Sequence, residues 1–205
     1  MSQRAVSIVL LLGSYDNVTK ALLNNIKEEI AKIFAGKTFA FLLENLEIYM
    51  TDRFEVLAEI EDNQLITLYL FEGSSLHDVL DLPLKTGENP DDIVSSYLKH
   101  NFDISRINKR SVTAKYGLLM SLAVEIFLVR HKEETHGGEY VELMHALFTG
   151  QSEKVWLFRN NSITVSSMLM EYLDMFRVKI RTYDSSFDLK TSILRIVSYS
   201  VENRQ

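Results

Sequence analysis

Unbroken apolar runs and helical stripes follow one another at the start of the chain. Val6 to Leu12 form a continuous apolar run that closes at Gly13-Ser14, a pattern typical of a strand buried on both faces. Apolar residues then recur at steps of three and four from Val18 to Phe34, the period of an amphipathic helix. Asp16 or Asn17 would cap this helix. The pattern therefore predicts a strand followed directly by a helix.

The next part of the chain fits two secondary structures. Thr38 to Leu43 is predicted to be a second strand. Leu46 to Ile60 keeps helical spacing, but Phe54 to Ile60 also alternates like a strand. A helix, or a hairpin that turns at Asp62-Asn63, would explain this stretch equally. In either case Leu65 to Phe71 is predicted to be the third strand.

The weakest pattern covers residues 73–108. Prolines and a glycine mark loops there, and Asp91 to His100 is predicted to be a short helix. We interpret this segment as an insertion or lid.

Strands and helices alternate through the second half of the chain. The predicted order is a helix (Ser111 to Leu122), a strand (Ala123 to Val129), a loop with two glycines (His131 to Gly138), a helix from Glu139, a strand (Val155 to Phe158), a helix (Ser162 to Met175), a strand (Val178 to Ile180) and a helix (Ser186 to Ser200). Apolar strands separated by amphipathic helices indicate a parallel sheet with helices on both faces. We predict a three-layer α/β/α sandwich with a mainly parallel, five-stranded sheet of the Rossmann or flavodoxin type.

Composition narrows the class of protein. Of the 205 residues, 46% are hydrophobic and 24% are charged, which is typical of one folded domain spanning residues 1–205. The net charge of -6 argues against a nucleic acid duplex as partner. The absence of cysteine excludes disulfides, thiolate catalysis and cysteine-based zinc sites, and favours a cytoplasmic location. The apolar run from Ser7 to Leu12 is too short to span a membrane, so no membrane partner is expected.

Polar residues follow three of the predicted strands, and the carboxyl ends of parallel strands meet at one edge of a sheet. They are Gly13, Ser14, Tyr15 and Asp16 after the first strand, Glu72 and Gly73 after the third, and residues 130–142 after the fourth. Gly13-Ser14 before a helix could bind phosphate through backbone N–H groups, or could simply form a tight turn. Neither a Walker A motif nor a three-glycine dinucleotide fingerprint is present.

Three residues at helical spacing are the main candidates for chemistry. Glu139, Glu142 and His145 would share one helix face, either as solvated surface charge or as part of a site. Glu142 could then be a nucleophile or base toward an anomeric carbon. Histidines 131, 136 and 145 do not make a convincing metal site, because only one Glu-x-x-His unit is present. We therefore expect no metal and no other cofactor.

A family resemblance rests on this helix. The segment His136-Gly-Gly-Glu-Tyr-Val-Glu142-Leu-Met-His-Ala-Leu147, with Lys154 to Phe158 after it, resembles the nucleoside 2-deoxyribosyltransferase-like superfamily. Members show Asp-x-Gly-Thr-x-x-Glu-x-Gly-x-Ala here, followed by a strand. The match puts Gly138 at the glycine position, Glu142 at the catalytic glutamate and Ala146 at the helix alanine. The chain departs from the motif at three positions, with His136 for aspartate, Glu139 for threonine and Met144 for the second glycine.

The resemblance implies a nucleoside or nucleotide as ligand and an N-glycosidic enzyme, of deoxyribosyltransferase or N-glycohydrolase type. Glu142 would act on the anomeric carbon of the sugar. Phosphoribohydrolases and TIR-type NAD glycohydrolases, which are distantly similar, also use one glutamate. The residues implied to bind the ligand are those of the loop after the first strand (Gly13, Ser14, Tyr15) and of the glycine loop (His136, Gly137, Gly138, Glu139), with Tyr15 or Phe71 stacking on the base.

Two other functions fit the same scaffold. Thr135-His136-Gly137 after an apolar strand also looks like the loop of CRISPR-associated Rossmann-fold sensors, which bind cyclic oligonucleotides across a dimer. A third possibility is an interaction module, because the run from Met168 to Phe176 is more apolar than one helix face requires. We interpret that run as core plus the surface of a homodimer.

Overall fold

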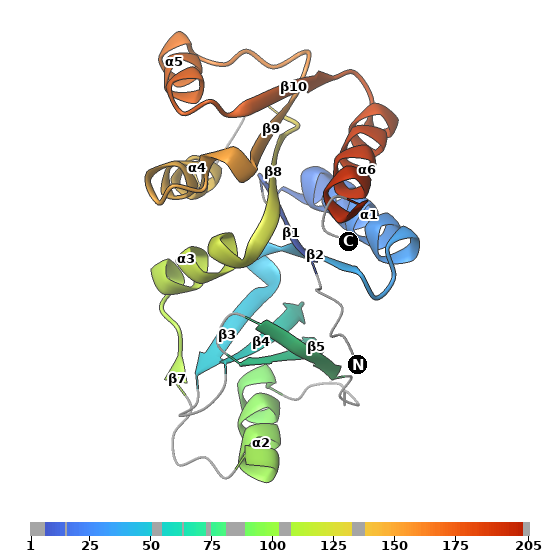
Figure 1. The fold of residues 1–205 in the computed structure, drawn as a ribbon, viewed down its shortest axis with the longest axis vertical. Helices are drawn as coiled ribbons and strands as arrows, with labels where there is room; N and C mark the ends of the chain where they lie inside the picture. The colour runs from blue at the N-terminus through green and yellow to red at the C-terminus, as the bar shows by residue number, and fades with distance from the viewer. Residues whose placement is uncertain are drawn as a thin grey trace. The chain divides into compact units, whose positions relative to one another are not determined.

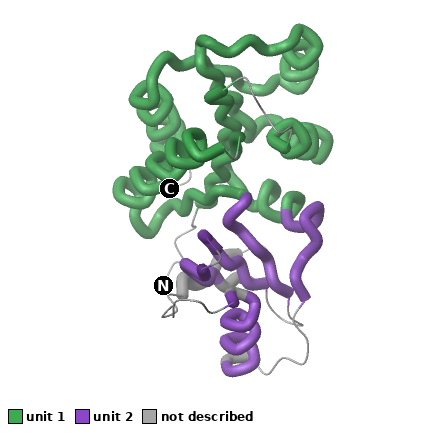
Figure 2. Tube along the Cα trace, turned by 180° about the vertical axis from the view of Figure 1, so that it is seen from behind, with its two compact units in different colours: residues 1–43, 116–205 green, residues 44–115 purple. Residues whose placement is uncertain are grey.

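The computed structural model describes residues 7–14, 16–50, 55–62, 64–72, 75–80, 89–102, 108–132 and 138–202. The chain forms two compact units, which Figure 2 shows in different colours. The first unit comprises residues 1–43 and 116–205, and the second unit comprises residues 44–115. Residues 73–108, predicted as an insertion or lid, fall within the second unit, which begins well before them.

The first unit contains a parallel sheet of five strands in the order β10-β9-β8-β1-β2. The strands are β1 (Ser7–Gly13), β2 (Thr38–Leu42), β8 (Ala123–Arg130), β9 (Val155–Asn160) and β10 (Lys179–Tyr183). Every residue of β1 is buried, as expected for a central strand with helices on both faces. The predicted α/β/α sandwich with a parallel five-stranded sheet is confirmed.

Helices cover both faces of this sheet (Figure 1). On one face lie α1 (Asn17–Ile33) and α6 (Ser186–Glu202), and on the other lie α4 (Gly138–Phe148) and α5 (Ser167–Met175). The helix α3 (Val112–Leu122) leads directly into β8. A turn of 3-10 helix (Leu43–Asn45) precedes β3, and a second one (Ser152–Lys154) precedes β9. The core on the α1 and α6 side includes Phe127 and Phe158, whose rings meet edge to face with centroids 6.0 Å apart.

The second unit contains an antiparallel sheet of five strands in the order β6-β5-β4-β3-β7. Its elements are β3 (Leu46–Met50), β4 (Glu55–Glu61), β5 (Gln64–Glu72), β6 (Ser75–Leu80), α2 (Pro90–Phe102) and β7 (Asn108–Lys109). Val94 and Leu98 of α2 pack against Val56, Ala58 and Leu68 of the sheet. The helix predicted over residues 91–100 is confirmed as part of α2.

Two predictions for this region need correction. The helix considered for residues 46–60 is wrong, and the alternative hairpin is right, because β4 pairs with β5 up to Glu61 and Gln64. The turn between them includes Asp62 at φ 47, a left-handed conformation that aspartate tolerates. The predicted third strand exists as β5, but it belongs to the antiparallel sheet and not to the parallel one. The turn between β4 and β5 is too short for the crossover that parallel strands require. Glu72 at the end of β5 therefore does not contribute to the edge of the parallel sheet, and Gly73 lies outside the described residues.

Candidate functional site

The strand order of the first unit reverses between β1 and β8. The crossover through α1 leads from β1 to β2 on one side, and the crossover through α4 leads from β8 to β9 on the other. In open α/β sheets, ligands bind in the crevice outside the carboxyl ends of the strands at such a switch point. The candidate site therefore lies where β1 ends at Gly13 and β8 ends at Arg130.

Gly13 allows β1, β8 and α1 to approach one another closely. A Cβ atom at this position would lie 3.0 Å from the carbonyl oxygen of Val129 and 3.1 Å from Cγ2 of Thr19. Contacts this short are tighter than most Cβ contacts, so a neighbouring atom would have to move by a few tenths of an ångström, and glycine at this strand end has a packing role. Ser14, the next residue, is buried. Tyr15 lies outside the described residues, so its predicted stacking on a base stays a prediction.

Asp16 caps the first helix with its carboxylate. It accepts hydrogen bonds from the backbone N–H groups of Val18 (3.0 Å) and Thr19 (3.1 Å), and from the Thr19 hydroxyl (2.6 Å). The N–H groups that a phosphate might have used at the start of α1 therefore already have an acceptor. Lys132 Nζ lies 3.0 Å from the same carboxylate, so this ion pair joins the chain after β1 to the chain after β8.

The pKa of Asp16 is held well below its usual range. Burial raises the pKa, but hydrogen bonds from Thr19, Lys132 and Ser14 stabilise the ionised carboxylate and outweigh that effect. The negative charge at this edge is therefore permanent at neutral pH.

A buried ion pair lies on the other side of the switch point. Arg130 and Glu139 are only 4% and 3% exposed, and Arg130 Nε lies 3.8 Å from Glu139 Oε1. The Arg130 guanidinium also sits 5.1 Å from the centroid of the Tyr140 ring. Glu139 belongs to the first turn of α4, where the helix dipole favours a carboxylate.

Glu142 lies one turn further along α4 and is 1% exposed. The interpretation of Glu139 and Glu142 as solvated surface charge is therefore wrong, because both residues are buried. His145 shares their spacing but has a different environment, since its Nε2 atom lies 3.7 Å from the position of a Cβ on Gly117 of α3. The helix thus places Glu139 beside Arg130 at the strand end and buries Glu142 one turn further on, whereas His145 lies close to α3.

His131, which follows β8, is hydrogen-bonded to a residue of β10, the strand on the far side of β9. Its Nδ1 atom lies 2.9 Å from the hydroxyl of Tyr183 on β10, and the two rings are stacked. The Tyr183 hydroxyl also donates to the carbonyl oxygen of Arg130 (3.3 Å), and burial raises the pKa of Tyr183 above its usual range. Across the described parts of the chain, no three metal-ligating side chains gather into a site.

The remaining predicted ligand-binding residues belong to the glycine loop. His136 and Gly137 lie outside the described residues. Gly138 begins α4, is exposed, and has open space around it where a side chain would be. Arg130 and Lys132 were predicted only as members of the range 130–142, although a basic residue at the end of an apolar strand is a usable signal for such a site.

The described helices include none that is long and apolar enough to cross a membrane. Comparisons with models of protein families and with curated proteins found no match to this chain.

Proposed function

We propose that the protein binds a nucleoside or nucleotide at the switch point between β1 and β8, and that Glu142 is the residue that acts on it. The observation that carries the proposal is the buried pair of Arg130 and Glu139 at the end of β8, with Glu142 buried one turn further along α4. Each of these three charged side chains is at most 4% exposed. Burying charges costs several kcal/mol per ion even when they are paired. Charges kept in this way at a ligand-binding edge support a functional role.

The chemistry that fits this cluster is cleavage of an N-glycosidic bond. A carboxylate at Glu142 would attack or stabilise the anomeric carbon while the C–N bond breaks and the base leaves with its electron pair. Water or a second base would then take the sugar, which gives hydrolysis or transfer. Arg130 would supply a fixed positive charge for a phosphate or for the carboxylates beside it. The resemblance to deoxyribosyltransferases points to the same residue.

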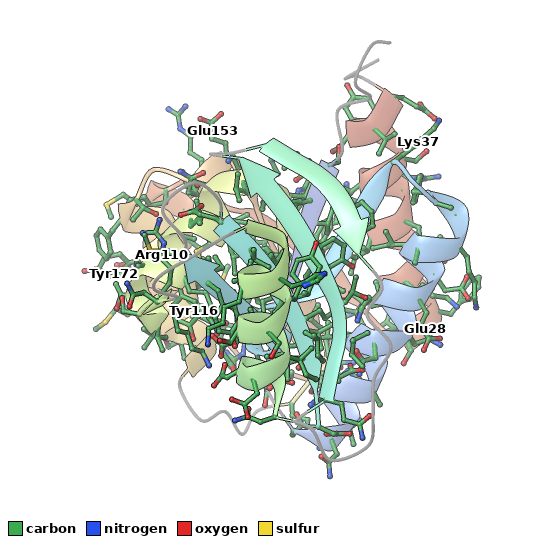
Figure 3. All side chains as sticks on the ribbon, turned by 90° about the horizontal axis from the view of Figure 1, so that it is seen from below. Glu28, Lys37, Arg110, Tyr116, Glu153 and Tyr172 are labelled. Carbon is green, nitrogen blue, oxygen red and sulfur yellow. The ribbon has the colours of Figure 1, made fainter. Side chains whose placement is uncertain are left out.

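The test is to incubate the protein with nucleosides, NAD and nucleoside monophosphates and to measure the free base released by chromatography. The variant is Glu142→Gln, which keeps the shape of the side chain. The matched control is Glu153→Gln, because Glu153 projects from the surface (Figure 3). We expect Glu142→Gln to lower the rate about 100-fold or more, and Glu153→Gln to leave it unchanged. If the folded wild-type protein releases no base from any of these compounds, catalysis is rejected.

The very low exposure of Glu142 also favours a second candidate, a sensor that binds a nucleotide without turnover. Binding of nucleotides, including cyclic oligonucleotides, would then raise the melting temperature while every compound is recovered intact. Ligands that raise the melting temperature of the wild type but not of Glu142→Gln would assign binding to this edge. A ligand that stabilises both proteins equally would place its site elsewhere.

A homodimer is proposed from the apolar surface of α4 and α5. Phe148 at the end of α4 and Phe176, which caps the carboxyl end of α5, meet edge to face with ring centroids 5.5 Å apart. The exposed side chains of this surface are Val141, Phe148, Met168, Tyr172 and Met175. Light scattering should give twice the chain mass, and Met168→Lys should lower it. A strict monomer at high concentration would reject the dimer.

A further inference from the structure

A groove of about 550 Å³ opens at the amino end of the parallel sheet, away from the switch point. It is lined by Glu125 near the start of β8, Trp156 near the start of β9, Lys179 and Arg181 of β10, and Arg195 and Tyr199 of α6. All these residues belong to the first unit. The volume lies within the range of about 300–1,000 Å³ that small-molecule sites have.

The tryptophan in this groove is held in place by a partly buried hydrogen-bond network. Trp156 Nε1 donates to Glu125 Oε2 (2.8 Å), and the Ser200 hydroxyl donates to Glu125 Oε1 (2.5 Å). Both oxygens of the carboxylate are therefore engaged with neighbours on β9 and α6. This arrangement holds the indole ring in one orientation before any ligand arrives, which lowers the entropy cost of binding.

Positive charge surrounds the ring. Lys179 Nζ lies 4.6 Å from the centroid of the Trp156 ring, and the guanidinium carbon of Arg181 lies 5.2 Å from it. Arg195 adds a third cation, against the single carboxylate of Glu125. Within the described part of the chain, none of the three cations forms an ion pair with an acid. The groove is thus a positive site on a protein whose net charge is -6.

We propose that this groove binds a small organic anion that combines a flat ring with a phosphate or carboxylate group. Arginine and lysine supply the donors that such groups require, and arginine does so in bidentate geometry. The rings of Trp156 and Tyr199 form part of the groove wall, against which a flat ring would pack. The site is separate from the switch point and does not depend on the function proposed there.

Trp156 also provides the readout, because it is the only tryptophan in the chain. Its fluorescence and its single indole N–H cross-peak in a proton–nitrogen correlation spectrum report on this groove alone. The probes are phenyl phosphate, benzoate, inorganic phosphate and benzyl alcohol. We expect saturable changes with phenyl phosphate or benzoate, and the tighter of the two identifies the anionic group. Inorganic phosphate should bind more weakly, and benzyl alcohol should cause no saturable change.

Two variants and a control complete the test. Arg181→Gln and Arg195→Gln should each weaken binding of the preferred aromatic anion about 10-fold, the worth of one charge-assisted hydrogen bond. The control Lys37→Gln should leave the affinity unchanged, since Lys37 is an exposed cation outside the groove (Figure 3). The proposal is overturned if neither aromatic anion perturbs the indole resonance saturably, if benzyl alcohol binds as tightly, or if both arginine variants keep wild-type affinity.

Discussion

Replacing Arg130 by methionine removes the cation from the buried pair at the end of β8 and leaves Glu139 charged in the interior. The two groups are 3.8 Å apart and almost fully buried. At an effective dielectric constant of about 20, their attraction is worth about 4 kcal/mol. Loss of one partner from a buried pair costs about 3–5 kcal/mol, because the remaining charge is uncompensated. We therefore expect Arg130→Met to destabilise the first unit by about 4 kcal/mol.

The assay is unfolding in urea followed by the fluorescence of Trp156, which lies on β9 of the same unit. The double variant Arg130→Met with Glu139→Gln should recover part of the loss, since it removes both charges. Arg195→Met, which removes an exposed arginine, should change the free energy of unfolding by no more than about 0.5 kcal/mol. The reasoning is refuted if Arg130→Met costs no more than Arg195→Met, or if the double variant is no more stable than Arg130→Met alone.

Two further predictions concern the chain after β1. Gly13→Ala should destabilise the first unit by about 1–3 kcal/mol in the same assay, because its Cβ would meet the backbone 3.0 Å away. Gly138→Ala, which has open space around it, should cause no comparable loss, and equal effects would contradict the packing role of Gly13. Asp16→Asn keeps a capping side chain but removes the charge. Because the pKa of Asp16 is lowered on folding, its carboxylate stabilises the protein above an unfolded pKa of about 3.9 and loses this effect as pH falls toward the folded value. The difference in unfolding free energy between wild type and Asp16→Asn should therefore be largest near neutral pH and shrink in acid, whereas a constant difference would refute the assignment.

The parallel sheet could be predicted because its central strands have mainly apolar sequences, as expected for strands covered on both faces. Strand β1 is buried throughout, and β8 is apolar from Ile126 to Val129. Residues 46–60 could not be assigned in the same way. Their spacing fitted a helix and a strand equally, and the outcome depended on pairing with β5, which local periodicity does not encode. Tertiary pairing overrode the local signal there.

The candidate site was predictable only in part. The spacing of Glu139 and Glu142 put them on one helix face, but their burial depends on how α4 packs against the sheet. The groove around Trp156 could not be predicted from the sequence. Its residues come from β8, β9, β10 and α6, and their meeting depends on tertiary contacts such as the sheet register that pairs Lys179 with Trp156.

The order of the segments along the chain has a consequence for how the protein folds during synthesis. The first unit is assembled from two separate stretches, 1–43 and 116–205, and its central strand pair joins Ile8 to Ala123. The second unit is one uninterrupted stretch, so all of it leaves the ribosome before the first unit can complete its sheet. Until β8 emerges, the apolar strand β1 lacks its neighbour on that side, and its unpaired edge is exposed to association with other chains. Such distant pairing makes the parallel sheet the slower part to form.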